Sequence, residues 1–317
     1  LDLGLKGLGD LGSILRQSSG QGNSLLDGSQ LANVARVLDR SRALRALLLE
    51  SGKPRLLQRS KNLTDLPALR ERLEKTLDSS GEILDDASEA LLELRIHAQS
   101  LEEEIRDWLE SHRDLSPWKK FLQGAVITPR NGRFCWAVRA ECRHQVRGII
   151  HGESASGQTL FVEPEQVVRR GNQLQKYQDK IVQEQRRIIA DLSREVWGKS
   201  KQVIELWNQL VQLDMVQAKA RFSENFGCQI PQISDDRDLE LLNARHPLLI
   251  WREILERRKQ FTLPETVDRP LLDQVYSEIT PLDLRLNSGQ FQLVVTGPNT
   301  GGKTVVLKTA GLLPLMA

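Results

Sequence analysis

The stretch FQLVVTGPNTGGKT, residues 291–304, joins an apolar run to a glycine-rich loop. Its last eight residues match Gly-x4-Gly-Lys-Thr, the pattern of a phosphate-binding loop. The apolar run Phe291–Thr296 predicts a strand that enters the loop, and Lys303–Leu313 predicts a helix that leaves it. Because this is the context in which the pattern binds phosphate, a chance glycine-rich turn is the weaker interpretation.

Each residue type in the loop suits nucleotide binding. Glycines allow a tight turn that points backbone N–H groups at phosphates, and the start of the next helix adds positive charge. The Lys303 ammonium is expected to reach the β- and γ-phosphates of ATP, and the Thr304 hydroxyl to bind Mg²⁺. The predicted nucleotide site is Gly297, Pro298, Asn299, Thr300, Gly301, Gly302, Lys303 and Thr304.

Such a site also needs an acidic strand end that holds Mg²⁺ and activates water. Residues 305–317 contain no Asp or Glu, so the catalytic residues are unknown. We therefore do not expect this chain alone to hydrolyse ATP. Whether the protein is an enzyme is left open by the sequence.

Most of the sequence before the loop has helical periodicity. Residues 1–80 indicate short helices, and 82–113 and 165–222 indicate two long ones, the second with a possible bend at Gly198. The first long helix has apolar residues at alternating spacings of three and four, which predicts packing along a partner helix. This seam is Leu84, Ala87, Leu91, Leu94, Ala98, Leu101, Ile105 and Trp108.

Residues 121–163 change to short runs rich in Val, Ile, Phe and Trp. These runs predict a small antiparallel sheet of three or four strands, and Asn131-Gly132 is a strong hairpin signal. The chain is thus expected to go out along one helix, turn through the sheet and return along the other. The predicted strands are Ala125–Thr128, Arg133–Ala140, Val146–His151 and Gln158–Glu163.

The predicted β tip is basic. From Lys119 to His151 there are two Lys and five Arg against one acid, Glu141. Such a patch attracts a phosphate backbone without reading sequence, whereas an ordinary solvated sheet face is an equally good interpretation of the residues alone. The expected nucleic-acid contacts are Arg130, Arg133, Arg139, Arg143 and Arg147.

The composition says more about the cellular compartment of the protein than about its function. Among 317 residues the three cysteines show no metal-ligand spacing, which favours a reducing, cytoplasmic compartment over a disulfide scaffold. No run of about 18 apolar residues occurs, so we expect no membrane partner. The net charge of +2 excludes nothing.

Four motifs resemble the MutS family of DNA-repair ATPases. Residues 296–304 resemble its TGPN-x-GGK-S/T loop, and Arg245-His246-Pro247 resembles its RHP motif. Thr304, the segment SASGQTLFVEP at 154–164 and GEILD at 81–85 are similar to the second bacterial branch. That branch comprises endonuclease homologues that suppress recombination and have been tied to rescue of collided ribosomes.

The resemblance implies a mostly α fold with a small antiparallel β tip, then the first part of an α/β P-loop domain of ABC type. The expected parts are a core and ascending lever helix (1–120), a clamp-like tip (121–164), a descending helix (165–244) and an incomplete ATPase domain (245–317). It also implies ATP and Mg²⁺ as cofactors and a homodimer. The family's mismatch-reading and small nuclease domains are not expected here.

Three functions are compatible with these features. The first is an ATP-dependent protein that binds branched or duplex DNA as a dimer and suppresses recombination. The second is a ribosome-associated ATPase whose basic tip grips ribosomal RNA, since phosphate backbones look alike to arginine. The third is a structural helical module with an inert phosphate loop.

Overall fold

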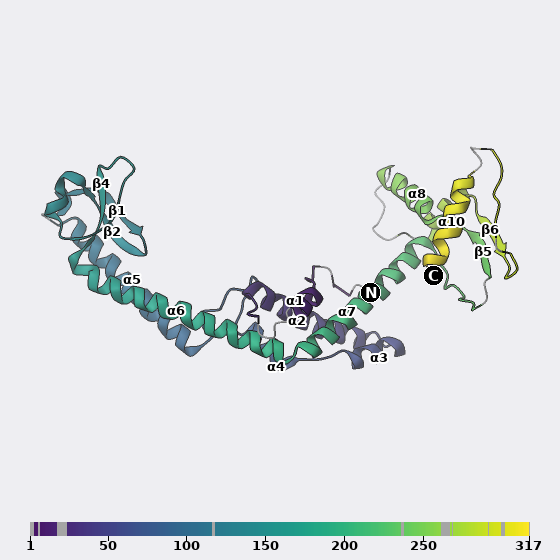
Figure 1. Cartoon of the computed structure of the whole chain (residues 1–317), viewed down its shortest axis with the longest axis horizontal. Coiled ribbons are helices and arrows are strands. Elements are labelled where there is room, and N and C mark those ends of the chain that lie inside the picture. The colour runs from purple at the N-terminus through teal and green to yellow at the C-terminus, as the bar shows by residue number, and fades with distance from the viewer. Residues whose placement is uncertain are drawn as a thin grey trace. The chain divides into compact units, whose positions relative to one another are not determined.

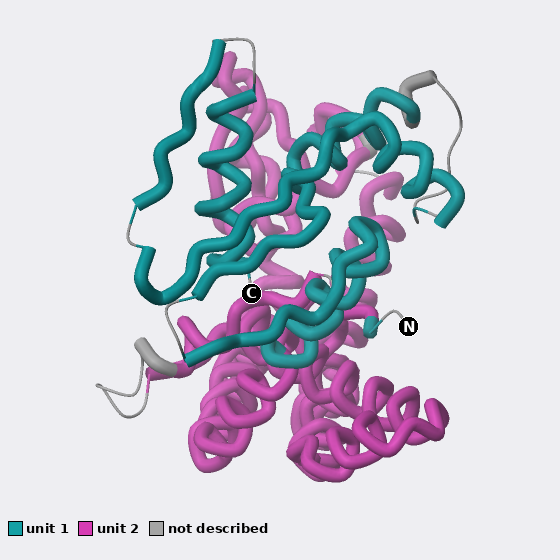
Figure 2. Tube along the Cα trace, turned by 90° about the vertical axis from the view of Figure 1, so that its right-hand side faces the viewer, with its two compact units in different colours: residues 1–3, 211–317 teal, residues 4–210 magenta. Residues whose placement is uncertain are grey.

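The computed structural model describes the chain except residues 1–2, 6, 18–23, 116–117, 236–237, 261–266, 268, 291, 299–301 and 317. The chain forms two compact units, residues 4–210 and residues 1–3 with 211–317 (Figure 2). The division falls inside one helix, α7 (Ser200–Phe226).

The first 80 residues form helices, as predicted: α1 (Leu11–Gln17), α2 (Gly28–Glu50), α3 (Pro54–Asn62) and α4 (Pro67–Glu74). Asp27 and Gln30 make a capping box that starts α2, each side chain bonding the other residue's backbone N–H. Pro54 starts α3, where its missing N–H costs no helical hydrogen bond.

Two long helices, α5 (Glu89–Arg113) and α6 (Glu165–Gly198), lie side by side and lead away from α1–α4 (Figure 1). The prediction that the first begins at residue 82 was wrong by seven residues. Ser88 caps α5, since its Oγ accepts the Leu91 N–H at 3.1 Å. Before it, Asp78 Oδ1 accepts the N–H groups of residues 80–82, which holds them in a turn instead.

The predicted seam of α5 does face a partner helix, and that partner is α6. Leu91, Ala98 and Ile105 are buried as expected, but the last fully buried position is Leu109 and not Trp108. An α-helix has 3.6 residues per turn, so a strict seven-residue repeat drifts around its surface. The returning helix is interrupted after Gly198, where the expected bend lies, and α7 follows.

The sheet at the far end of α5 and α6 has four strands in the order β1-β2-β4-β3, all neighbours antiparallel. The strands are β1 (Leu122–Arg130), β2 (Arg133–Arg139), β3 (Gly148–Glu153) and β4 (Thr159–Pro164). Asn131 and Gly132 make the predicted hairpin turn, both with positive φ (50° and 74°). Two 3₁₀ turns, η2 (Trp118–Lys120) and η3 (Ala140–Gln145), flank the strands.

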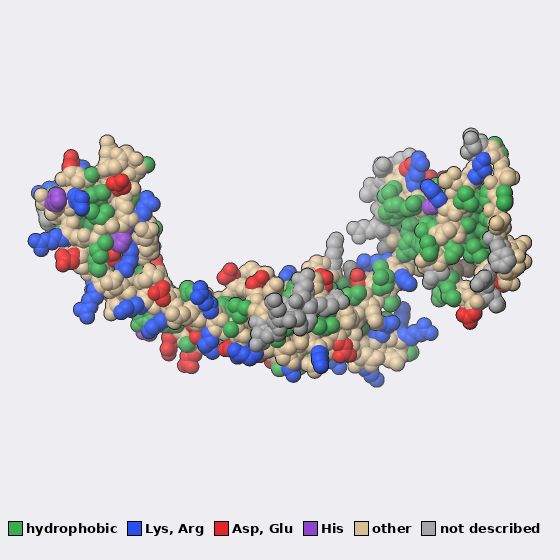
Figure 3. Space-filling model, viewed as in Figure 1, with side chains coloured by type: hydrophobic (Ala, Val, Ile, Leu, Met, Phe, Trp, Pro, Cys, Tyr) green, Lys and Arg blue, Asp and Glu red, His purple; other side chains and the backbone are tan. Residues whose placement is uncertain are grey.

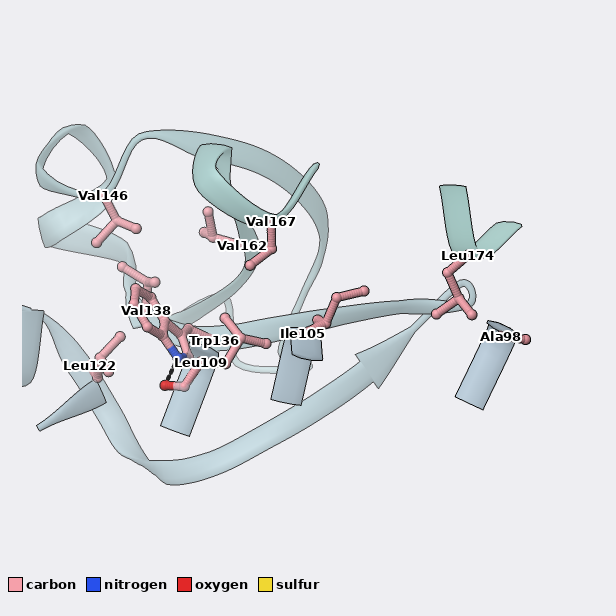
Figure 4. Packing of buried hydrophobic residues seen from close by; sticks show 10 residues of the cluster. All are labelled: Ala98, Ile105, Leu109, Leu122, Trp136, Val138, Val146, Val162, Val167 and Leu174. Carbon is pink, nitrogen blue, oxygen red and sulfur yellow. Dashed lines mark hydrogen bonds between the residues drawn. The ribbon is translucent and has the colours of Figure 1, made fainter. Parts of the chain in front are cut away.

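One apolar cluster fastens the sheet to the two helices (Figure 4). Trp136 of β2 is its largest fully buried side chain, and its indole Nε1 donates to the Leu109 carbonyl of α5 at 3.2 Å. The Trp136 ring also stacks on Trp108, with 5.7 Å between ring centres. A buried indole needs such a hydrogen-bond acceptor, so this contact fixes β2 on α5.

The unit containing residues 211–317 holds a two-stranded sheet of β5 (Leu239–Ala244) and β6 (Leu282–Leu286), with α8 (Pro247–Gln260), α9 (Arg269–Glu278) and α10 (Lys303–Met316). β5, α8 and α9 were not predicted from the sequence, and the strand predicted at 279–286 is shorter, since β6 covers Leu282–Leu286. The strand predicted at 291–296 was wrong for 292–296. Among the described residues no strand lies beside this segment, so its backbone lacks ladder partners.

Candidate nucleic-acid interface and phosphate loop

Four of the five predicted tip arginines are exposed cations. Arg130 ends β1, Arg139 ends β2, Arg143 lies in η3 and Arg147 precedes β3. Within the described parts of the chain none of them forms an ion pair, whereas many arginines of α2–α6 do, such as Arg106 with Glu102. Figure 3 shows Lys and Arg side chains around this end of the molecule. We call these four residues the tip arginines.

Arg130 is held in place without losing its charge. Its guanidinium carbon lies 4.2 Å from the centre of the Phe161 ring, a cation–π contact between β1 and β4. Among the described residues no carboxylate forms an ion pair with this guanidinium. The cation–π contact therefore presents Arg130 in a defined position while keeping it able to bind an anion.

Arg133 differs from the other predicted contacts. Its Nη1 donates to Glu163 Oε1 at 3.2 Å and its Nη2 to Asn172 Oδ1 at 2.7 Å, and only 18% of its side chain is exposed. Asn172 belongs to α6, so Arg133 joins β2 to both β4 and the helix. The structure thus corrects its predicted role, because its charge is taken up inside the protein.

Glu163 is the centre of this internal network. Its side chain is 2% exposed and accepts a second hydrogen bond from His151 Nε2 at 2.7 Å. The His151 carbonyl in turn accepts from Asn131 Nδ2 at 3.3 Å. A buried carboxylate is costly unless paired and fully hydrogen-bonded, so these partners are required for Glu163 to stay at this position. Nothing in the sequence pattern distinguished this carboxylate from a surface one.

Cys135 lies on the same strand as Arg133 and is fully buried. Burial raises the pKa of its thiol to about 12, and the nearby Glu163 charge adds to the effect. A thiol with this pKa stays protonated in the cell, so Cys135 is a packing residue and not a nucleophile.

The described part of the phosphate loop begins α10 as predicted. The Gly302 carbonyl accepts the Val305 and Val306 N–H groups at 2.9 and 3.0 Å, and Gly302 has a φ of 75° that favours glycine. The Lys303 Nζ donates to the Gly297 carbonyl, so the ammonium points back toward the start of the loop. Pro298 and Thr304 flank this turn, and Asn299, Thr300 and Gly301 lie outside the described residues.

These loop residues fit a phosphate group. A 14-residue helix starts at the loop, so its N-terminal N–H groups and positive dipole end face the loop. The Lys303 ammonium is within reach of the same place.

The Arg245-His246-Pro247 motif has a structural role. His246 is buried and begins α8, since its carbonyl accepts the Leu249 N–H at 3.0 Å and its Nδ1 the Leu248 N–H at 3.2 Å. The Arg245 guanidinium lies 4.8 Å from the Tyr276 ring centre and donates to the Ile279 carbonyl at 3.1 Å. The motif thereby ties the start of α8 to the end of α9.

No helix in the described parts is both long and apolar enough to cross a membrane.

No protein-family model matches the chain. Curated relatives named Endonuclease MutS2 do match it. The relative from Pelotomaculum thermopropionicum is 35% identical over 311 residues, which is 97% of this chain and 36% of the relative. The relative from Geobacillus sp. strain WCH70 is 34% identical over 99% of this chain and 37% of its own length.

A third relative, from Lactobacillus helveticus, is 37% identical over 80% of this chain and 29% of its own length. The chain thus spans about a third of the length of the curated relatives it matches. In the first two relatives the match covers nearly the whole chain. Over the residues it spans, the chain is a relative of the MutS2 proteins, the second bacterial branch of the MutS family.

Proposed function

We propose that this chain binds the phosphate backbone of branched or duplex DNA through the tip arginines. The observation that carries the proposal is that these four cations are exposed and lack an ion pair among the described residues, on a sheet fixed rigidly to two long helices. Cations that no internal carboxylate neutralises are available for phosphates. The relatives' name, Endonuclease MutS2, favours DNA as the polyanion.

The same geometry favours binding without sequence readout. Arginines at the ends of strands and in short turns present charge, while specific reading needs an element that enters a groove. The proposed DNA preference is therefore one of shape, branched against linear, and not of sequence. Suppression of recombination by a homodimer is the cellular role that fits such binding.

We further propose that residues 297–304 hold ATP with Mg²⁺, with Lys303 at the β- and γ-phosphates and Thr304 at the metal. The support is the helix start at Gly302–Lys303 and the Lys303 ammonium that faces the loop. Bound Mg²⁺ would neutralise phosphate charge, and this chain's own residues would position the nucleotide. The effect of the bound nucleotide on the tip would pass through α7, the helix in which the division between the two units falls.

The DNA proposal is tested by replacing Arg130, Arg139, Arg143 and Arg147 with Gln together. The matched control replaces four exposed cations of α6 and α7 that also lack ion pairs in the described structure, Lys176, Lys180, Arg186 and Lys201, with Gln. Affinity for a labelled four-way junction and a duplex is measured over a salt series. The slope of log K against log salt should become less steep by about 3–4 in the tip variant. The slope of the control should change far less. Equal slopes for the tip variant and the parent would reject the tip as the DNA contact.

A further inference from the structure

A second group of exposed cations lies on α3, far along the chain from the tip arginines. Residues 53–62 contain Lys53, Arg55, Arg59 and Lys61 and no acidic residue. All four side chains are exposed, and none forms an ion pair within the described parts of the chain. We call these four residues the α3 cations. Figure 3 shows Lys and Arg side chains on the part of the surface where Figure 1 places α3.

The spacing places two of these charges together. Arg55 and Arg59 are four residues apart, so they lie on one face of the helix, and the exposed amides of Gln58 and Asn62 lie on the same side. The opposite side carries Leu56, Leu57 and the buried Ser60. α3 thus has one polar, cationic face and one face that packs against α2.

Helix stability explains only half of the α3 cations. Lys and Arg in a last turn interact favourably with the helix dipole, which accounts for Arg59 and Lys61. Lys53 occupies the N-cap position without making a capping hydrogen bond, and Arg55 lies in the first turn, where the dipole is positive and a cation is unfavourable. Among the residues that the structure describes, no carboxylate pairs with either side chain, so both are available to an external anion.

The helix is also held firmly. Gln209 of α7 donates from Nε2 to the Asn62 carbonyl at 3.1 Å and accepts the Thr64 N–H at Oε1 at 3.0 Å. Arg45 of α2 pairs with Asp65, just after α3, at 2.9 Å. These contacts fix the C-terminal end of α3, the helix that carries the cations. A fixed helix lowers the entropy cost of binding a large partner.

We propose that the α3 cations form a second binding surface for a nucleic-acid phosphate backbone, separate from the tip arginines. The anion is a polynucleotide and not a lipid surface, because α3 exposes no large apolar side chain that could enter a membrane interface. Exposed amides beside arginines also suit sugar and phosphate oxygens. This surface goes beyond the proposed tip function and does not depend on it.

The test replaces the four α3 cations with Gln and measures binding to a labelled 40-base-pair duplex over a salt series. A second variant, Lys53→Gln with Arg55→Gln, removes only the two charges that oppose the helix dipole and so should not unfold α3. The control is the Lys176, Lys180, Arg186 and Lys201 variant. We expect the fourfold variant to lose about 3–4 from the salt slope and the double variant about 2, with the control far less affected.

The α3 and tip variants together distinguish the α3 surface from the proposed DNA contact of the tip arginines. Loss in the α3 variants with no change in the tip variant would reject the tip contact and keep the α3 surface. Unchanged DNA affinity and slope in both α3 variants would overturn the α3 surface, whatever the tip variant does. Vesicles containing 30% phosphatidylserine serve as the second ligand, and a loss confined to vesicle binding would likewise overturn it.

Discussion

Glu163 and Gly171 lie so close that a Cβ atom at position 171 would come within 2.4 Å of Glu163 Oε1 and 2.6 Å of Arg133 Nη1. Gly171 lies inside α6, where glycine costs about 1 kcal/mol relative to alanine. The missing Cβ gives the carboxylate and the guanidinium room against the helix. One helical glycine thus allows the buried ion pair that joins the tip sheet to α6.

The first prediction concerns this glycine. Gly171→Ala should lower the free energy of unfolding by about 1–3 kcal/mol, because a methyl group must displace two buried charged groups. Gly198→Ala is the control, since a Cβ there meets no atom of the described residues within 4 Å beyond its chain neighbours and its own helix backbone. Urea unfolding followed by tryptophan fluorescence compares the two. A Gly171→Ala protein as stable as the parent would show that the close approach carries no energetic weight.

The second prediction concerns the ion pair. Glu163→Gln should destabilise the chain by about 2–4 kcal/mol, because Arg133 keeps a largely buried charge without its partner. Adding Arg133→Gln should restore part of that loss, so that the double variant is more stable than the sum of the single losses predicts. Strictly additive losses in urea unfolding would contradict a direct interaction between the two side chains.

The third prediction uses the pKa of the Cys135 thiol. Its pKa of about 12 lies above that of the unfolded thiol, so at pH 8 the folded protein holds it protonated and buried. Iodoacetamide at pH 8 should therefore modify the exposed Cys228 well before Cys135, as peptide mass spectrometry would show. In urea the difference should vanish. Equal rates of modification in the folded protein would contradict the burial of Cys135.

The fourth prediction concerns the phosphate loop. Lys303→Ala should weaken binding of Mg²⁺–ATP by about tenfold or more, because a charge-assisted contact to the phosphates is lost. Lys308→Ala, which removes an exposed cation from the same helix, is the control and should bind as the parent does. Isothermal titration calorimetry measures both. If the Lys303→Ala protein binds ATP as tightly as the parent, the nucleotide site lies elsewhere.

Local sequence signals predicted the two long helices and the four-stranded sheet at their end well. The seam of α5, the turn at Asn131-Gly132 and the strand runs are each encoded within a few residues, so periodicity and turn chemistry locate them. The start of α5 was missed because the competing turn depends on a side chain, Asp78, that lies outside the helix.

Long-range features could not be predicted in this way. Arg133 looks the same in the sequence as Arg139, and only the fold shows that it faces Glu163, 30 residues later. The absence of a strand at 292–296 has a similar cause, because a strand forms only with a neighbour, and the apolar pattern does not contain that neighbour.

The decisive measurement of DNA binding uses the unaltered chain with a labelled four-way junction, a linear duplex and purified ribosomes, each over a salt series. We expect tighter binding to the junction than to the duplex, with a steep negative salt slope for both. Tight binding to ribosomes with weak, salt-insensitive binding to both DNAs would contradict this expectation and would assign the exposed arginines to a ribosomal partner.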